Sequence, residues 1–171
     1  VIDLQNEGFF KARILSTQYE KTPEDKYVIV HVSIDEGPLT QLSQLEFTGN
    51  ESFSQGELRE VVNLKINTPL KLAALETGLQ TLKDFYKQNG FLEMTLLNEE
   101  SQLIQYTQSN TLAQMNIKIH EGPQISIRSI VIEGNVETKD FVILRRLTFQ
   151  PGEILTHEKM AESIALLKRT G

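Results

Sequence analysis

A nine-residue pattern that ends in Glu-Gly-Pro occurs twice in this chain. One copy begins at Val30 and the other at Met115, so the numbering offset between the copies is 85 (115 − 30). In both, apolar and polar residues alternate before the closing Glu-Gly-Pro. A repeat of this length predicts a series of similar small units rather than one large domain, because each unit reuses one architecture.

The same offset continues beyond the repeated pattern. Three apolar residues have apolar counterparts in the second copy: Leu42, Leu45 and Phe47 correspond to Ile127, Ile130 and Ile132. The pair Gly49 and Asn50 corresponds to Gly134 and Asn135. Glycine and asparagine both tolerate positive φ, so each pair indicates a turn after a strand.

Before the repeated pattern the offset is smaller. Gly8 corresponds to Gly90, so the offset there is 82 (90 − 8). The difference must fall between residues 16–26 of one copy and residues 98–111 of the other. Both stretches are polar, so we expect an insertion in a hairpin loop.

These offsets divide the chain into three parts. Residues 38–122 form one complete unit, which we call the central unit. Residues 1–37, the first unit, correspond to the end of such a repeat, and residues 123–171, the third unit, correspond to its beginning. We therefore expect the chain to be an excerpt of a longer protein.

Composition and charge argue against several classes of function. The net charge is −6 and the basic residues are scattered, which argues against nucleic acid as a partner. There is no cysteine, so disulfides and thiolate chemistry are excluded. His31, His120 and His157 lie in different units without other ligands at metal-binding spacing. We expect no metal, no cofactor and no enzymatic activity.

Local patterns predict the secondary structure of the central unit. Residues 43–48 alternate and favour a strand. Ser54 and Glu57 have the spacing of a capping box, which predicts a short helix to about residue 63. Leucines at helical spacing predict a longer helix over 71–88. Two strands follow, at 91–97 and 112–120, joined by a polar loop.

The order β-α-α-β-β predicts an α+β fold in which a three-stranded sheet packs on two helices. The first unit supplies a helix end at residues 1–6 and the β-hairpin. The third unit supplies β-α-α, with Thr138 and Thr156 as the expected N-caps of its two helices.

Several of these motifs together resemble those of the POTRA family. They are the helix-to-strand junction Tyr86–Phe91, its weaker copy at residues 6–9, and the two Glu-Gly-Pro boundaries. The resemblance covers essentially the whole chain, which is most similar to the tandem POTRA modules of BamA-like outer-membrane assembly factors. TamA-like proteins and two-partner secretion transporters carry related modules and remain alternatives.

The resemblance implies a periplasmic scaffold whose parent protein carries a C-terminal outer-membrane barrel. Its expected partners are unfolded outer-membrane proteins and accessory lipoproteins, and nucleic acid is not expected. Its expected mechanism is β-augmentation, in which an exposed edge strand pairs with an extended guest. A purely structural spacer is the alternative from another functional class.

The resemblance also implies where clients bind. In this family the second strand lies at an edge of the sheet. The residues of that strand expected to face away from the helices and contact a client are Phe91, Glu93, Thr95 and Leu97, with Phe9, Lys11, Arg13 and Leu15 in the first unit. The alternative for Phe91 and Phe9 is packing under the helix junction. The expected inter-module hinges are Gly37, Pro38, Gly122 and Pro123.

The two partial units are complementary. The first unit lacks its first strand and most of its helices, and the third unit lacks its hairpin. The first unit of one chain could therefore complete the third unit of another, which predicts head-to-tail self-association.

Overall fold

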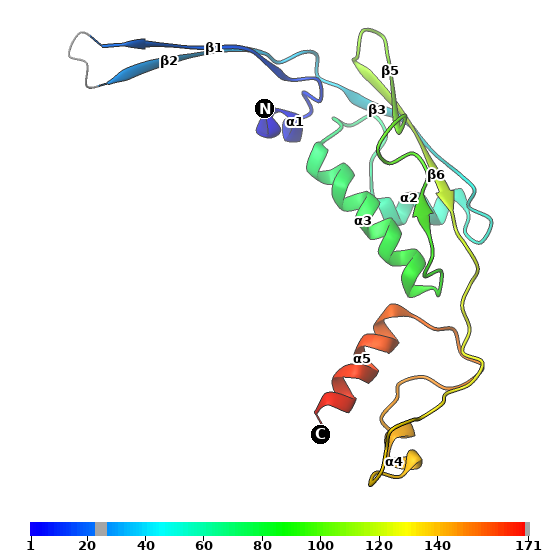
Figure 1. The fold of residues 1–171 in the computed structure, drawn as a ribbon. Helices are drawn as coiled ribbons and strands as arrows, with labels where there is room; N and C mark the ends of the chain where they lie inside the picture. Colours follow the sequence, from blue (N-terminus) through cyan, green and yellow to red (C-terminus); the bar gives the residue numbers. More distant parts are fainter. Residues whose placement is uncertain (23–26, 170–171) are drawn as a thin grey trace.

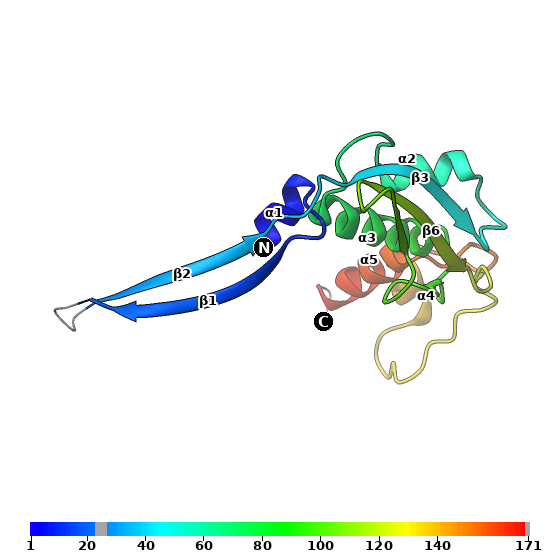
Figure 2. The same ribbon diagram turned by 90° about the horizontal axis from the view of Figure 1, so that it is seen from above.

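The computed structural model describes residues 1–22 and 27–169, which form an elongated molecule of three parts (Figures 1 and 2). The elements in chain order are α1 (Ile2–Glu7), β1 (Arg13–Lys21), β2 (Val28–Asp35), β3 (Gln41–Thr48), α2 (Gln55–Val62), α3 (Leu72–Gln88), β4 (Thr95–Leu96), β5 (Ile104–Thr107), β6 (Leu112–His120), α4 (Asp140–Leu144) and α5 (His157–Lys168). The hairpin of β1 and β2 projects from the middle part, and α4 and α5 lie at its other end.

The middle part is a sheet packed on two helices, so the expected α+β architecture is confirmed. β6 is the central strand and pairs with β3 in parallel on one side and with β4 and β5 in antiparallel on the other. α2 and α3 cover one face of this sheet. The fully buried side chains between the layers include Leu45, Leu58, Leu82, Tyr86 and Ile117. Alternation along β3 and β6 places their apolar residues on the helix side.

Local sequence signals account for the helix ends of the central unit. Ser54 and Glu57 form the expected capping box at the start of α2. Lys71, the N-cap of α3, offers no side-chain hydrogen bond. Instead, the Oδ1 atom of Asn6 in the first unit accepts a hydrogen bond of 2.8 Å from the N–H of Ala73. A helix of one unit is therefore capped by the preceding unit, since its first N–H groups have no partner within the helix.

The second strand of the central unit is shorter and more broken than the pattern predicts. Only β4 is a strand within the expected range 91–97, and β5 lies in the stretch expected to be a loop. Between them the chain leaves the sheet at Asn98. The expectation of one continuous strand and a plain polar loop was wrong, because pairing with β6 resumes after this excursion.

The strand pairing shows where the insertion lies that changes the repeat offset from 82 to 85. Ile14 pairs with Ile34 as Leu96 pairs with Ile119, at an offset of 82 for the outer strand. Farther along, Tyr19 pairs with Val30 as Ile104 pairs with Met115, at an offset of 85. The extra residues therefore lie within the strand, at the excursion before β5. The prediction of an insertion in the hairpin loop was wrong.

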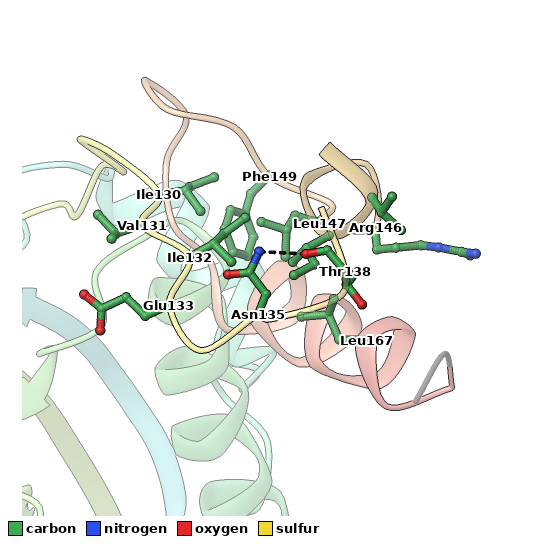
Figure 3. Close-up of a pocket in the computed structure, with 12 residues that line it drawn as sticks. Ile130, Val131, Ile132, Glu133, Asn135, Thr138, Arg146, Leu147, Phe149 and Leu167 are labelled. Carbon is green, nitrogen blue, oxygen red and sulfur yellow. Dashed lines mark hydrogen bonds between the residues drawn. The ribbon is translucent and has the colours of Figure 1, made fainter. Parts of the chain in front are cut away.

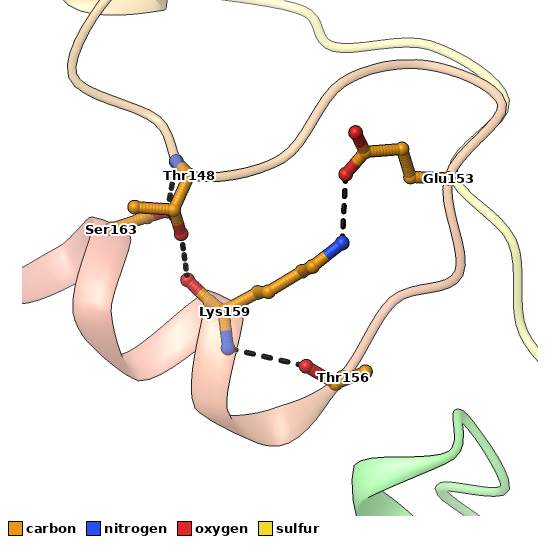
Figure 4. Close-up of polar contacts among 5 residues, drawn as sticks. All are labelled: Thr148, Glu153, Thr156, Lys159 and Ser163. Carbon is orange, nitrogen blue, oxygen red and sulfur yellow. Dashed lines mark hydrogen bonds and ion pairs between the residues drawn. The ribbon is translucent and has the colours of Figure 1, made fainter.

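The third unit forms its helices without its expected strand. The only pairing within residues 125–133 that the described chain shows is an isolated bridge between Ser126 and Ile154, and residues 130–133 follow an irregular path (Figure 3). α4 has Lys139 as its N-cap, so the prediction of Thr138 was wrong. Thr156 is the N-cap of α5 and accepts a hydrogen bond from the N–H of Lys159, as predicted (Figure 4).

A polar cluster holds α5 against the segment that follows α4. Ser163 is 2% exposed, and its Oγ atom accepts a hydrogen bond of 2.9 Å from the N–H of Thr148 (Figure 4). The hydroxyl of Thr148 donates to the carbonyl of Lys159 at 2.9 Å. The counterpart of Ser163 in the central unit is Gly78, where a Cβ atom would lie 2.7 Å from the carbonyl oxygen of Val62. Two equivalent helix contacts therefore use different chemistry.

Candidate functional site

The central sheet has two edges, and polar groups occupy the β3 edge. The side-chain amide of Gln55 bonds both backbone groups of Phe47, accepting from its N–H at 3.0 Å and donating to its carbonyl at 2.6 Å. The Nε atom of Arg59 donates to the carbonyl of Leu45 at 3.1 Å. Residues 67 and 68 bond the backbone of Leu42. An incoming strand would have to displace these partners, because a backbone group already bonded offers little to a guest.

The opposite edge, formed by β4 and β5, has no such cover. Among the described residues, no strand lies outside β4 or β5. The N–H of Leu97 donates inward to Lys118, and the carbonyl of Leu103 accepts inward from Asn116. Since backbone bonding alternates along an antiparallel strand, the amides of Leu96, Ile104 and Tyr106 face the open edge.

The structure places the predicted contact residues of the central unit in two environments. Glu93, Thr95 and Leu97 are exposed, and Leu97 has 66% of its surface accessible. Phe91 is only 6% exposed and packs edge-to-face against Phe53 and Tyr86. The expectation that Phe91 faces away from the helices was wrong, because its ring completes the aromatic cluster at the end of α3. The alternative position under the helix junction is the one observed.

The corresponding residues of the first unit are also divided. Phe9 is partly buried, and the ammonium of Lys11 lies 3.8 Å from the ring centroid of Tyr106, where it forms a cation–π contact with the central unit. Arg13 forms a 3.0 Å ion pair with Asp35 of the neighbouring strand. Leu15 is exposed. The structure therefore brings Lys11 to the contact between units and leaves Leu15 on the hairpin surface.

Asn98 shapes the open edge, a role that no pattern in the sequence predicted. Its side chain is buried and takes the place of a strand residue against β6, donating to the carbonyl of Asn116 at 2.8 Å and accepting from the N–H of Lys118 at 2.9 Å. It also donates to the carbonyl of Gln102. The edge is thus divided into the short segments β4 and β5. An asparagine in a polar stretch gives no local signal of this role, since its partners are distant in sequence.

A buried polar contact fixes the closing Glu-Gly-Pro of the central unit. Glu121 accepts a hydrogen bond of 2.9 Å from the Tyr86 hydroxyl and bonds of 2.6 Å and 3.1 Å from the hydroxyl and N–H of Ser52. Burial raises the pKa of Tyr86 above its usual range, and the hydrogen bond to Glu121 and its negative charge add to this. Helix α3, the turn after β3 and the end of β6 therefore meet at one carboxylate.

The two junctions between units share one geometry. Gly37 and Gly122 both have φ of +67°. One backbone hydrogen bond of 2.9 Å crosses each junction: from the N–H of Thr40 to the carbonyl of Gly8, and from the N–H of Ile125 to the carbonyl of Gly90. These donors and acceptors are equivalent in the repeat, so the junctions are built alike.

The glycines at the ends of α1 and α3 allow the units to approach closely. A Cβ atom on Gly8 would lie 2.7 Å from the Cβ atom of Pro69, and a Cβ atom on Gly90 would collide with Ile154. Ile154 is the counterpart of Pro69. Both glycines also have positive φ, a conformation that other residues adopt only with strain.

Two kinds of site find no support in the described part of the chain. Within residues 1–22 and 27–169, no helix has the length and apolar character needed to cross a membrane. No group of three or more histidine, aspartate and glutamate side chains in those residues is arranged to hold a metal ion.

Known proteins resemble this chain in sequence. The POTRA family model, described as "surface antigen variable number repeat", matches residues 40–122 and 125–171. A Treponema pallidum relative is 29% identical over 161 residues, which cover 92% of this chain and 19% of the relative. The outer membrane protein assembly factor BamA of Nitratidesulfovibrio vulgaris is 25% identical over 169 residues, which cover 96% of this chain and 21% of the relative. The chain thus spans about a fifth of the length of these relatives.

A solved structure has the same fold. The crystal structure of the POTRA3-5 segment of BamA from Haemophilus influenzae aligns with a TM-score of 0.62 at 20% sequence identity, covering 99% of this chain and 65% of that chain. The family model matches nearly all of the central unit and of the third unit, and the sheet packed on helices agrees with this match. The chain belongs to the POTRA family.

Proposed function

We propose that this chain is a periplasmic region of an outer-membrane protein assembly factor and receives unfolded outer-membrane proteins by β-augmentation along β4 and β5. The observation that carries the proposal is the contrast between the two sheet edges. The side chains of Gln55 and Arg59 form hydrogen bonds to backbone groups at the β3 edge. The amides of Ile104 and Tyr106 instead face an edge without a neighbouring strand among the described residues. The similarity to outer membrane protein assembly factors named BamA supports the assembly role.

The chemistry of this edge suits transient binding of many clients. Backbone pairing depends little on client sequence, because every residue except proline offers the same N–H and carbonyl groups. Asn98 divides the edge, so a guest can pair with only four residues at β5 and two at β4 before it meets the excursion. Short pairings of this kind bind weakly and release readily. POTRA modules are not enzymes, and the transfer of a client by strand pairing makes or breaks no covalent bond.

The parent protein and its other partners form part of the same proposal. We place a C-terminal outer-membrane barrel after the POTRA region, and accessory lipoproteins on its surface, by similarity to assembly factors. Articulation between modules takes place at Gly37, Pro38, Gly122 and Pro123, where the chain has no regular secondary structure. The backbone hydrogen bond that crosses each junction limits this motion.

A structural spacer is the second candidate function. The close glycine contacts and shared hydrogen bonds of the two junctions favour it, because they hold neighbouring units at a defined distance. A spacer would maintain geometry without binding an extended client. The two functions therefore differ in whether the open edge pairs with a peptide.

The proposal is tested by NMR, by following the amide chemical shifts of the full chain during titration with an extended peptide. The peptide alternates apolar and polar residues over about ten positions, like a transmembrane β-strand. We expect shifts at Leu96, Ile104 and Tyr106 and none at Leu45 or Phe47. The absence of shifts at millimolar peptide would contradict client binding and favour the spacer.

The variant Gln55→Ala supplies the matched control. It frees the N–H and carbonyl of Phe47, so we expect a second set of peptide-dependent shifts along β3. If the wild-type protein instead binds the peptide on β3, the assignment of the open edge is wrong.

A further inference from the structure

Two side chains of β5 lie where a guest strand at the open edge would pack against them. Tyr106 pairs with Ala113 of β6, and two positions earlier Ile104 pairs with Met115. Ala113 and Met115 are buried on the helix side of the sheet. Paired residues of neighbouring strands share a face, so Ile104 and Tyr106 also point to the helix side. Both are only partly buried, and a strand added beside β5 would place alternate side chains against them.

The ring of Tyr106 is held by two successive residues of the first unit. The Nζ atom of Lys11 lies 3.8 Å from the centroid of this ring. The ring of Phe10 lies 6.2 Å from it, centroid to centroid, with the two planes inclined at 39°. Burial raises the pKa of Tyr106 to about 12, so the hydroxyl is neutral at physiological pH and the Lys11 contact is a cation–π contact rather than an ion pair. The first unit therefore fixes a side chain of the open edge.

The junction between the units also anchors the turn that follows β5. Thr40 is fully buried, and its hydroxyl donates to the carbonyl of Asn110, between β5 and β6, at 2.8 Å. Its N–H donates to the carbonyl of Gly8 in the first unit at 2.9 Å. Lys11 lies at the same junction, because a Cβ atom on Gly37 would lie 3.4 Å from the Cβ atom of Lys11. One short region of the chain thus contacts the first unit, the junction and the β5–β6 hairpin.

We infer that Phe10 and Lys11 complete the client site of the central unit, because they hold the ring of Tyr106 where an apolar side chain of the guest strand packs against it. The inference rests on the proposed function. It gives Lys11 a positioning role toward the following unit in place of contact with a client on its own strand. Gln105 and Thr107 are exposed and leave the other side chains of the guest in water. The favoured guest alternates apolar and polar residues, and its apolar face meets a surface made by two units.

The equivalent position at the second junction carries the opposite charge. Glu93 is the counterpart of Lys11 at the offset of 82. A Cβ atom on Gly122 would lie 3.1 Å from the Cβ atom of Glu93, so the two residues occupy the same place beside their junction glycines. A carboxylate cannot form a cation–π contact. Guest preference can therefore differ from one unit to the next, although backbone pairing is the same in each.

Lys11→Met tests the inference, because methionine keeps an unbranched apolar stem and removes the cation. The full chain is titrated with a peptide of about ten residues that alternates valine and serine, and the amide shifts of Ile104 and Tyr106 report binding. We expect the Kd to rise about two- to fivefold, as loss of an exposed cation–π contact implies. Lys11→Arg should restore the wild-type Kd, since a guanidinium also binds the face of a tyrosine ring. Lys21→Met, which removes the same charge at the far end of β1, should bind like wild type (Figure 1).

Hydrogen exchange of the Thr40 amide separates an effect on Tyr106 from an effect on the junction. We expect this exchange to be the same in Lys11→Met and wild type. Weaker peptide binding together with faster exchange at Thr40 would mean that Lys11 acts by holding the units together, and would overturn the inference.

The same titration distinguishes this inference from the function on which it rests. Shifts at Ile104 and Tyr106 with an equal Kd for wild type and Lys11→Met would overturn the inference and leave client binding at the open edge intact. Absence of these shifts in the wild-type protein would contradict the proposed function, and the inference with it.

Discussion

At the scale of single residues, this fold depends on polar side chains that replace backbone partners. Gln55 bonds both backbone groups of a β3 residue, and Asn98 bonds β6 where the neighbouring strand leaves the sheet. Glu121 accepts hydrogen bonds from Ser52 in the turn after β3 and from Tyr86 in α3. Each of these side chains pairs with donors or acceptors in partly or fully buried positions, and loss of one would leave those partners without their hydrogen bond.

Glu121→Ala tests this dependence. The change leaves the Tyr86 hydroxyl and the Ser52 N–H without their acceptor, so we expect the free energy of unfolding to fall by about 2 kcal/mol. Glu36→Ala is the matched control, because Glu36 occupies the equivalent place in the first unit and is exposed. Urea denaturation of both variants measures the difference. Equal stabilities would mean that the Glu121 contact contributes little.

At the scale of elements, the helices and strands with local sequence signals were predicted, and the features that depend on distant partners were not. β3, α2, α3 and β6 follow from alternation, a capping box and leucine spacing, signals that lie within each element. The split of β4 from β5 depends on Asn98 meeting β6, which no local pattern reveals. The first strand of the third unit was expected from the repeat, but a strand requires a neighbour and the described chain supplies none there.

The candidate site was predictable to a similar extent. The exposed positions of Glu93, Thr95 and Leu97 follow from strand alternation. Alternation also assigned Phe91 to the open face, but the aromatic cluster around Tyr86 buries its ring. The occupation of the β3 edge by Gln55 was not predictable, since it depends on how α2 packs beside β3.

The capping box of α2 makes part of the stability pH-dependent. Hydrogen bonds from the side chain and then the backbone of Ser54 lower the pKa of Glu57 below its usual value of 4.5. The contribution of this carboxylate is therefore present above pH 4.5 and is lost as the pH falls through the lowered pKa. We expect Glu57→Gln to lower the melting temperature at neutral pH and to lose less stability than wild type on acidification.

Thermal unfolding of the two proteins at neutral and acidic pH measures this difference. Glu60→Gln, which removes a charge from the same helix outside the cap, is the control. An acid loss that is the same for Glu57→Gln and wild type would contradict the role of the Ser54 contact.

At the scale of the whole molecule, the structure is a string of units joined by repeated contacts. The equivalent glycines, hydrogen bonds and φ angles of the two junctions show that the repeat includes the connections as well as the units. The sequence predicted the order of units, and the crossing bond became visible only in three dimensions. The relation between neighbouring units is thus part of the design that repeats.

Gly90→Ala tests the contribution of the second junction. The added Cβ atom collides with Ile154 and favours a negative φ, so we expect the crossing bond from the N–H of Ile125 to weaken. Hydrogen exchange of that amide should accelerate by about tenfold or more, as a loss of roughly 1.4 kcal/mol implies. Gly56→Ala is the control, since Gly56 has no close neighbour at its Cβ position other than Ser54. Unchanged exchange in Gly90→Ala would show that the junction does not depend on this contact.

The central claim is that an extended client pairs with the backbone of the β4–β5 edge. Amide hydrogen exchange of the full chain, with and without saturating strand peptide, tests it most directly because paired amides are protected from exchange. We predict slower exchange at Leu96, Ile104 and Tyr106 and no change at Phe47, whose N–H is already bonded to Gln55. Unchanged exchange at all three open-edge amides with bound peptide would contradict the claim.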